Sequence, residues 1–250
     1  MILKAILFDL DGTLTDTDSA HFFVWKTLLA NHNLWIDLNF YKKHISGKTN
    51  AKIIRDILPN LSKLDAVQLA ENKEQQFRDY ADLERLAGLD RLLTLCRSQA
   101  IRRAVVTNAP RANADHMLQA LGLMTEHHAE FETIVLAEDL PRGKPSPDPY
   151  LEGLRRLGVA PEVTIAFEDT PTGVRAAVAA GLTTIGVRTT YAADDLTAMG
   201  ATLTIANFRD RALWTWLRSN YGLALEMVNS PLQDPIEAIE SRDRWETIEK

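Results

Sequence analysis

Two carboxylates stand directly after the first apolar run of the chain. The run from Ile2 to Phe8 indicates a strand covered on both faces. Asp9 and Asp11 follow it, at the end of the strand where open α/β sheets bind ligands, and Gly12 allows a sharp turn. Two carboxylates so close together favour a shared hard cation such as Mg²⁺, which often accompanies a phosphate. The alternative interpretation is an ordinary turn, since Asp, Gly and Thr are all turn residues.

A threonine and an asparagine follow a second predicted strand, at 103–106. The hydroxyl of Thr107 and the amide of Asn108 stand just before a helical pattern, where backbone N–H groups help to bind an oxyanion. A helix cap made by these two residue types is the alternative, and for this pair alone it is the stronger interpretation.

A lysine stands in a loop whose backbone is restricted by three prolines. Lys144 belongs to the segment Gly-Lys-Pro-Ser-Pro-Asp-Pro at 143–149, and each proline fixes one backbone angle. A rigid loop can hold one charged side chain in place, so we expect Lys144 to neutralise a phosphate or the carboxylates themselves. A solvated surface lysine explains this residue equally well when it is taken by itself.

A second acidic pair, Glu168 and Asp169, follows the strand predicted at 163–167. It repeats the position of the first pair, at the carboxyl end of a buried strand. A helix cap competes with a ligand role, because Pro171 suits the first position of a helix. Alone the cap is the stronger interpretation, but the four segments together point to one site.

Short apolar runs alternate with helical patterns from about residue 100 onward. This alternation predicts an α/β fold with a doubly wound parallel sheet. Further strands are expected at 133–136, 163–167, 184–187 and 202–205, and helices at 111–121, 149–157, 172–180 and through Leu213 and Leu217.

Residues 17–85 break this alternation, because they carry helical periodicity and no strand pattern. They predict an α-helical cap domain inserted into a core domain made of residues 1–16 and 86–220. A C-terminal extension, residues 221–250, is either a docked helix or a frayed end. The apolar residues assigned to the packed faces of helices are Phe22, Trp25, Leu28, Leu29, Ile53, Ile54, Ile57, Leu58, Leu64, Val67, Leu69, Phe77, Tyr80 and, in the core domain, Cys96.

The composition narrows the class of protein. The chain has 250 residues, 46% hydrophobic and 25% charged, which is typical of a globular protein. Its net charge of -6 argues against a nucleic-acid partner. It has no apolar stretch long enough for a membrane span and no signal-peptide pattern at its start. The single cysteine excludes an intramolecular disulfide and suits the reducing cytoplasm, where we expect the protein to act.

The order of the four segments resembles a known family. Acid pair, Thr-Asn, framed lysine and second acid pair follow one another as in the haloacid dehalogenase superfamily, and the resemblance extends to about residue 218. The helical insert is similar to the cap of the subfamily that holds β-phosphoglucomutase, phosphoglycolate phosphatase and small sugar phosphatases. The resemblance implies a Rossmann-like core and an enzyme that uses Mg²⁺ and forms an aspartyl-phosphate.

The resemblance also implies a role for each segment. Asp9 is the expected nucleophile. Asp11 is the expected general acid and then the base for water. Thr107 and Asn108 hold phosphoryl oxygens, and Lys144 offsets the charge of the phosphoryl group and of the nucleophile.

The implied metal site uses both acidic pairs. The expected ligands are Asp9, the backbone carbonyl of Asp11, and Asp169, with Glu168 as a further ligand or as an acceptor beside them. Asp11 also separates branches of the family, because true dehalogenases attack carbon and lack this second aspartate. Its presence indicates phosphoryl transfer.

Cap residues bear on whether the enzyme is a phosphatase or a mutase. His21, Lys73 and the loop with Gly47 and Lys48 look like substrate-binding positions of β-phosphoglucomutase. A hinge role for the histidine and a solvated surface for the lysines are the alternatives. The mutase holds its distal phosphate with an arginine where this chain has Asn50. We therefore expect a monomeric phosphatase for a small phosphorylated metabolite, above all a sugar phosphate; a phosphosugar mutase and a non-catalytic phosphate-binding domain are the alternatives.

Overall fold

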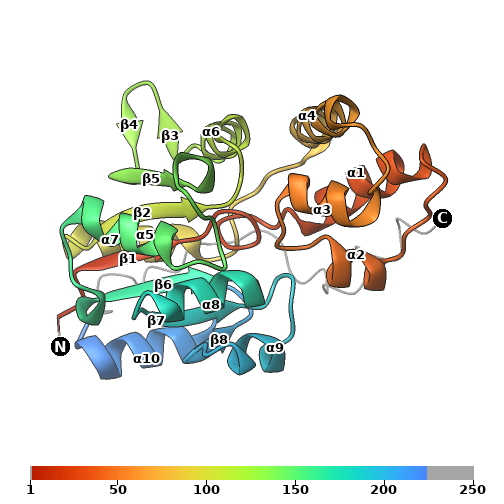
Figure 1. The fold of residues 1–250 in the computed structure, drawn as a ribbon. Coiled ribbons are helices and arrows are strands. Elements are labelled where there is room, and N and C mark those ends of the chain that lie inside the picture. The colour runs from red at the N-terminus through yellow and green to blue at the C-terminus, as the bar shows by residue number, and fades with distance from the viewer. Residues whose placement is uncertain (1, 224–250) are drawn as a thin grey trace, which may run out of the picture.

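The computed structural model describes residues 2–223, and a six-stranded sheet lies at its centre (Figure 1). The strand order is β5-β2-β1-β6-β7-β8, and every pairing is parallel. With these six strands counted in chain order, the arrangement is 3-2-1-4-5-6, that of the doubly wound fold. The strands are β1 (Ala5–Phe8), β2 (Arg102–Thr107), β5 (Thr133–Leu136), β6 (Thr164–Glu168), β7 (Thr183–Val187) and β8 (Leu203–Ile205).

Helices cover both faces of this sheet. A short hairpin of β3 (Met124–Thr125) and β4 (His128–Ala129) stands apart from it. One face carries α5 (Leu89–Ser98), α6 (Arg111–Ala120) and α10 (Arg211–Tyr221), and the other carries α7 (Asp148–Leu157) and α8 (Pro171–Ala179). The helix α9 (Ala193–Ala198) lies near β7 and β8. Two single-turn helices, η1 (Ala137–Asp139) and η2 (Pro161–Val163), lie in connections.

The central position of β1 in the sheet explains why its sequence is apolar. All four of its residues are buried, and alternate side chains enter opposite cores. Ile6 and Phe8 pack in the core of α5, α6 and α10, whereas Ala5 and Leu7 pack in the core of α7 and α8. The predicted fold class, a doubly wound parallel sheet with an inserted helical block, is confirmed.

The inserted block consists of four helices beside the sheet, α1 (Asp18–Ala30), α2 (Leu38–His44), α3 (Asn50–Ile57) and α4 (Lys63–Tyr80) (Figure 1). They share an apolar cluster of their own around Trp25, Tyr41 and Ile53. This separate cluster supports the division into a cap at 17–85 and a core domain, and the exact boundaries stay a prediction. The predicted C-terminal extension lies outside the described residues from 224 onward.

Several expectations of burial in the apolar segments were wrong. Leu64, Val67 and Tyr80 are 76%, 56% and 68% exposed. Leu64 and Val67 lie on the side of α4 that faces away from α1 and α3, against which Leu69 is buried, and Tyr80 is the last residue of the helix. Ile2 is also exposed, at 76%, because the strand begins only at residue 5. The buried position predicted for the single cysteine, residue 96, is confirmed.

Within residues 2–223, no helix is long and apolar enough to span a membrane.

Candidate active site

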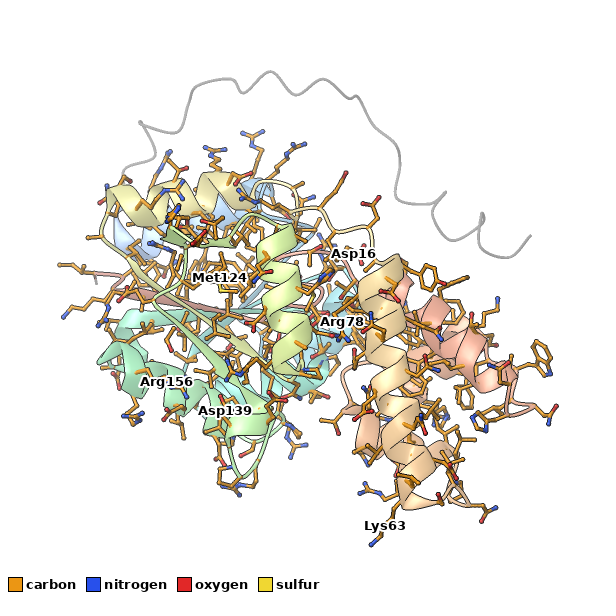
Figure 2. The ribbon with its side chains drawn as sticks, turned by 90° about the horizontal axis from the view of Figure 1, so that it is seen from above. Asp16, Lys63, Arg78, Met124, Asp139 and Arg156 are labelled. Carbon is orange, nitrogen blue, oxygen red and sulfur yellow. The ribbon has the colours of Figure 1, made fainter. Side chains whose placement is uncertain are left out.

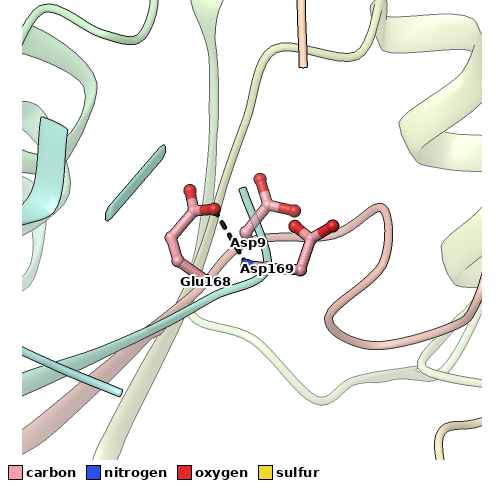
Figure 3. Close-up of side chains that lie close together, drawn as sticks. All are labelled: Asp9, Glu168 and Asp169. Carbon is pink, nitrogen blue, oxygen red and sulfur yellow. Dashed lines mark hydrogen bonds between the residues drawn. The ribbon is translucent and has the colours of Figure 1, made fainter. Parts of the chain in front are cut away.

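Two neighbouring strand ends bring the acidic pairs together. β1 and β6 run in register with Phe8 opposite Phe167, so Asp9 and Glu168 leave the sheet at the same edge. The strand order reverses between β1 and β6, which is the point where doubly wound sheets bind ligands. Carboxylate oxygens of Asp9, Glu168 and Asp169 lie within 4.8 Å of one another, and Figure 3 shows the three side chains converging.

The ammonium group of Lys144 lies between two of these carboxylates. It donates to Asp9 Oδ1 and Glu168 Oε1, both at 2.5 Å, and to the carbonyl of Val106 at 2.7 Å. The hydroxyl of Tyr150 donates to Glu168 Oε1 at 2.7 Å. Burial acts to lower the pKa of Lys144, but the two carboxylates outweigh it and raise the pKa above its usual value. The amine therefore stays charged and offsets part of the negative charge of the cluster.

Two of the three carboxylates, Asp9 and Asp169, have raised pKa values. Burial raises the pKa of Asp9 well above its usual value; the charge of Lys144 opposes this rise and that of Glu168 adds to it. Burial and the charges of Asp9 and Glu168 raise the pKa of Asp169, which accepts a hydrogen bond from Thr190 at 2.8 Å. A nearby cation would stabilise both ionised forms, and within residues 2–223 Lys144 is the only side-chain cation paired with this cluster.

The donor set fits a hard divalent cation. Asp169 Oδ1 is buried and has no hydrogen-bond partner among the residues that the structure describes. Three carboxylates with one unpaired oxygen match the oxygen ligands that Mg²⁺ prefers. The carboxylate of Asp11 lies outside this group, and the prediction assigned only its backbone carbonyl to the ion.

Two glycines leave room for the carboxylates. A Cβ atom on Gly12 would lie 2.1 Å from Asp169 Oδ2, and the φ angle of +73° also favours glycine there. A Cβ atom on Gly173 would lie 2.0 Å from the carboxylate oxygens of Glu168. The turn after β1 and the start of α8 thus require glycine for the site to assemble.

Asp11 faces the cap instead of the three-carboxylate cluster. Its Oδ1 accepts hydrogen bonds from the Thr17 hydroxyl at 2.9 Å and from His21 Nε2 at 3.0 Å. Lys73 Nζ lies 2.9 Å from His21 Nδ1, so Nε2 carries the histidine proton that is donated to Asp11. Burial acts to raise the pKa of Asp11, but these hydrogen bonds and the charge of Lys73 outweigh it, and the pKa lies below its usual value.

The predicted Thr-Asn pair has local structural contacts as well as a place at the site. Asn108 Oδ1 accepts from the backbone N–H of Lys144 at 3.0 Å, and its Nδ2 donates to that residue's carbonyl at 3.3 Å. Thr107 Oγ1 accepts from the N–H of Ala109 at 2.9 Å. Asn108 therefore holds the loop that carries the lysine, which the sequence did not reveal.

A cavity of about 780 Å³ joins these groups between the sheet and the helices α1–α4. Every predicted site residue except Glu168 lines it. Gly47 and Lys48 are among them, but the Lys48 ammonium donates to the carbonyls of Lys43 and His44, at 3.1 and 3.0 Å. The residues singled out from the sequence therefore lie around one cavity, apart from Glu168, and their roles stay predictions. The contact of Lys144 with the carboxylates was expected, whereas the other hydrogen-bond partners were not.

Five residues that line the cavity or donate to its carboxylates were not foreseen from the sequence. Only one carried a usable signal, since Thr17 stands at the expected entry to the cap. The others were indistinguishable from core residues or from helix surface: Glu74, Asn113, Tyr150 and Thr190.

The profile of the haloacid dehalogenase-like hydrolases matches residues 6–187, which include both acidic pairs, the Thr-Asn pair and the framed lysine. The chain belongs to this family. The predicted family and the predicted hydrolase class are therefore both confirmed.

Relatives of this hydrolase act on phosphorylated sugars, as their names state. It is 33% identical to fructose-1-phosphate phosphatase YqaB of Escherichia coli, over 73% of this chain and 95% of that one. It is 30% identical to the β-phosphoglucomutase of Bacillus subtilis, over 74% and 83%. The structure of a CbbY variant from Rhodobacter sphaeroides in complex with xylulose-(1,5)bisphosphate is similar at a TM-score of 0.71 and 26% identity, covering 84% of this chain and 96% of that chain.

Proposed function

We propose that this hydrolase is a Mg²⁺-dependent phosphatase that cleaves a small phosphorylated metabolite, most notably a sugar phosphate, through an aspartyl-phosphate. One observation carries the proposal. Asp9 is held by a buried lysine beside a carboxylate with an unpaired oxygen, at the base of a cavity that Asp11 also lines. The names of the sugar phosphatases among its relatives support the substrate class.

In the proposed reaction Asp9 attacks the phosphorus atom of the substrate. An Asp9 oxygen forms the new P–O bond as the bond to the leaving alcohol breaks. Lys144 keeps the nucleophile in place and offsets charge on the phosphoryl oxygens. Thr107 and Asn108 line the same cavity and offer a hydroxyl and an amide to those oxygens.

Asp11 is the proposed acid and base of the two half-reactions. It donates a proton to the leaving alcohol, and then takes one from the water that hydrolyses the aspartyl-phosphate. Its low pKa favours the ionised form, which takes the proton from water in the second half-reaction; for the first half-reaction Asp11 must bind a proton from solvent before it can donate one to the leaving alcohol. His21 and Thr17 hold the carboxylate toward the cavity.

Asp9 and Asp169 are the proposed metal ligands, with the backbone carbonyl of Asp11 and with Glu168 as a further ligand or supporting acceptor. Glu168 already accepts hydrogen bonds from Lys144 and Tyr150, which favours the supporting role. When bound, Mg²⁺ would reduce the repulsion between an anionic carboxylate and an anionic phosphate.

A phosphosugar mutase is the second candidate, and one contact favours it. His21 contacts both Asp11 and Lys73. His21 and Lys73 are two of the positions that look like substrate-binding positions of β-phosphoglucomutase. Asn50 argues against a mutase. Its amide is bound to Glu74, and an amide cannot replace the two-pronged arginine contact that holds a second phosphate. We propose further that the enzyme acts as a monomer in the cytoplasm.

The test is phosphate release from a panel of phosphorylated metabolites, with and without Mg²⁺. The panel contains hexose 1- and 6-phosphates, phosphoglycolate and nucleotides, and β-glucose 1-phosphate is also followed for isomerisation. We expect Mg²⁺-dependent release that is absent in Asp9→Asn. Isomerisation without net release would establish the mutase instead, and no turnover of any ester would favour a non-catalytic domain.

A further inference from the structure

The cap end of the cavity holds a buried carboxylate that the proposed reaction does not use. Glu74 of α4 is 8% exposed. Its two oxygens accept hydrogen bonds from the amides of Asn50 and Asn113 and from Lys73 Nζ, which lies 3.1 Å from each oxygen. A carboxylate offers about four lone-pair directions, and these contacts occupy all of them. The negative charge of Glu74 is therefore fixed in position.

The partners of Glu74 come from both sides of the cavity. Asn50 and Lys73 belong to α3 and α4, whereas Asn113 belongs to α6 beside the sheet. Asn113 Oδ1 in turn accepts from Arg78 at 2.5 Å, and Figure 2 shows Arg78 where α4 faces α6. Asp9 and Glu74 line the same cavity, so a substrate with its phosphoryl group at Asp9 has room to reach this carboxylate with its far end.

The cations near this carboxylate are already bound to other groups. The charge of Lys73 is matched by Glu74 itself. The ammonium of Lys48 donates to two backbone carbonyls, and Arg78 donates to Asn113 and to Gln75. A second phosphate would need cationic N–H groups to bind it, preferably a guanidinium fork. Those of Lys73 and Arg78 are already directed at Glu74, Asn113 and Gln75, so the phosphate would face the carboxylate oxygens of Glu74.

We propose that Glu74 is a specificity-determining residue that excludes a second anionic group from the cap end of the cavity. The substrate is then a monophosphate ester whose far end is uncharged and carries hydroxyls. This inference rests on the proposed phosphatase function and adds its substrate class. Uncharged hydrogen-bonding side chains of Ser46, Thr49 and Thr172 also line the cavity and suit such hydroxyls.

The experiment compares a hexose monophosphate with the bisphosphate of the same hexose, by kcat/KM at saturating Mg²⁺. The wild type is expected to prefer the monophosphate by about tenfold or more, because like charges placed together are strongly unfavourable. Glu74→Gln removes the charge and keeps the shape, so the bisphosphate-to-monophosphate ratio is expected to rise about tenfold. Glu74→Asp keeps the charge and is expected to leave the ratio near that of the wild type.

Asp79→Asn is the matched control, since Asp79 is an exposed acid on the same helix outside the cavity. Its ratio is expected to equal that of the wild type. A wild type that accepts both esters equally, or a Glu74→Gln variant that slows both by the same factor, would overturn the inference. The first outcome needs no variant, so the inference is testable even if Glu74→Gln does not fold.

Hydrolysis of para-nitrophenyl phosphate by the wild type separates this inference from the proposed function. This ester has no second anionic group, and its Mg²⁺-dependent cleavage is expected to be lost in Asp9→Asn. Cleavage of that ester together with equal use of the two hexose esters would contradict only the role of Glu74. No cleavage of any ester would overturn the proposed function and the inference with it.

Discussion

At the scale of single residues, the site is a balance of buried charges. Lys144 is 8% exposed and is the one cation that touches Asp9 and Glu168 among the described residues. Removing it leaves two carboxylates facing each other without a counter-charge, which is among the most costly changes that a protein interior can undergo.

Lys144→Met is therefore expected to lower both activity and stability. Loss of the charge that supports the reacting groups should reduce kcat by about a hundredfold or more. The free energy of unfolding should fall by about 3–5 kcal/mol, as for other buried pairs that lose one partner. Steady-state kinetics and urea denaturation measure the two effects. Lys63→Met, at the exposed start of α4, should change neither, and a Lys144→Met variant with wild-type kcat would contradict the assigned role.

Gly12→Ala tests the close approach of the turn after β1 to the second acidic pair. The new Cβ atom would overlap Asp169 Oδ2, so Asp169 must move and Mg²⁺-dependent phosphate release should fall about a hundredfold. The control is Gly222→Ala, because Gly222 has a similar φ of +62° but no atom within 4 Å of the added Cβ. Both variants should lose about 1 kcal/mol of stability through backbone strain. Equal activity losses would show that strain alone is responsible.

At the scale of elements, the sequence predicted the strands better than the side-chain partners. The strand expected at 133–136 has those bounds, and that expected at 103–106 spans Arg102–Thr107. These strands were predictable because buried parallel strands are continuous apolar runs. The helix α2 was not predicted, because it has seven residues and buries only Tyr41. So short a helix shows no helical periodicity of its apolar residues.

The contacts of the site were less predictable for a physical reason. Lys144 and Asp9 are 135 positions apart, and Glu74 and Asn113 are 39 apart. No local pattern encodes such pairs, because they depend on how strands and helices are arranged in space. The proline-rich loop and the resemblance to a family both pointed to Lys144, whereas nothing in the sequence pointed to Glu74.

The helix α7 carries an ion-pair arrangement with a defined pH dependence. Glu152 accepts from Arg155 and Arg156, both at 2.7 Å, and these hydrogen bonds lower the pKa of Glu152 from 4.5 to about 2. The folded pKa is below the unfolded one, so the stabilisation is present above about pH 4.5 and is lost as the pH falls toward 2. Its size should be below about 1 kcal/mol, because the pairs are exposed to solvent.

Glu152→Gln is expected to remove this pH-dependent part. The difference in free energy of unfolding between wild type and variant should be constant near neutral pH and shrink below about pH 4.5. Urea denaturation at a series of pH values measures it. A difference that grew on acidification would have the wrong sign and would contradict the assignment.

At the scale of the whole molecule, the proposed catalytic residues and metal ligands belong to the sheet domain, while the helical block lines the other side of the same cavity. His21 and Arg78 reach Asp11 and Asn113, and the Tyr191 hydroxyl donates to the carbonyl of Lys42 at 3.0 Å. Glu74 also accepts from Asn113, and Phe77 of α4 packs in the core of α5, α6 and α10. Opening of the helical block to readmit substrate would break these contacts.

Mg²⁺ and a phosphate analogue such as orthovanadate should favour the closed arrangement, because a bound ligand contacts both bodies. Small-angle X-ray scattering is expected to give a smaller radius of gyration with both ligands than without. The Asp9→Asn variant with Mg²⁺ alone is the control and should match the ligand-free wild type. Identical profiles in all samples would show that the block does not move.

The central position of β1 has a consequence for how the protein is made. β1 leaves the ribosome before both of its partners, β2 and β6, which follow about 100 and 160 residues later. At about 5–20 residues per second, this apolar strand waits on the order of ten seconds for its second neighbour. The helices α1–α4, which pack mainly on one another, are complete long before that. A nascent chain halted before β6 would therefore hold a complete helical block while β1, although β2 has been made, still has one edge without its partner strand. Such an unpaired edge favours aggregation.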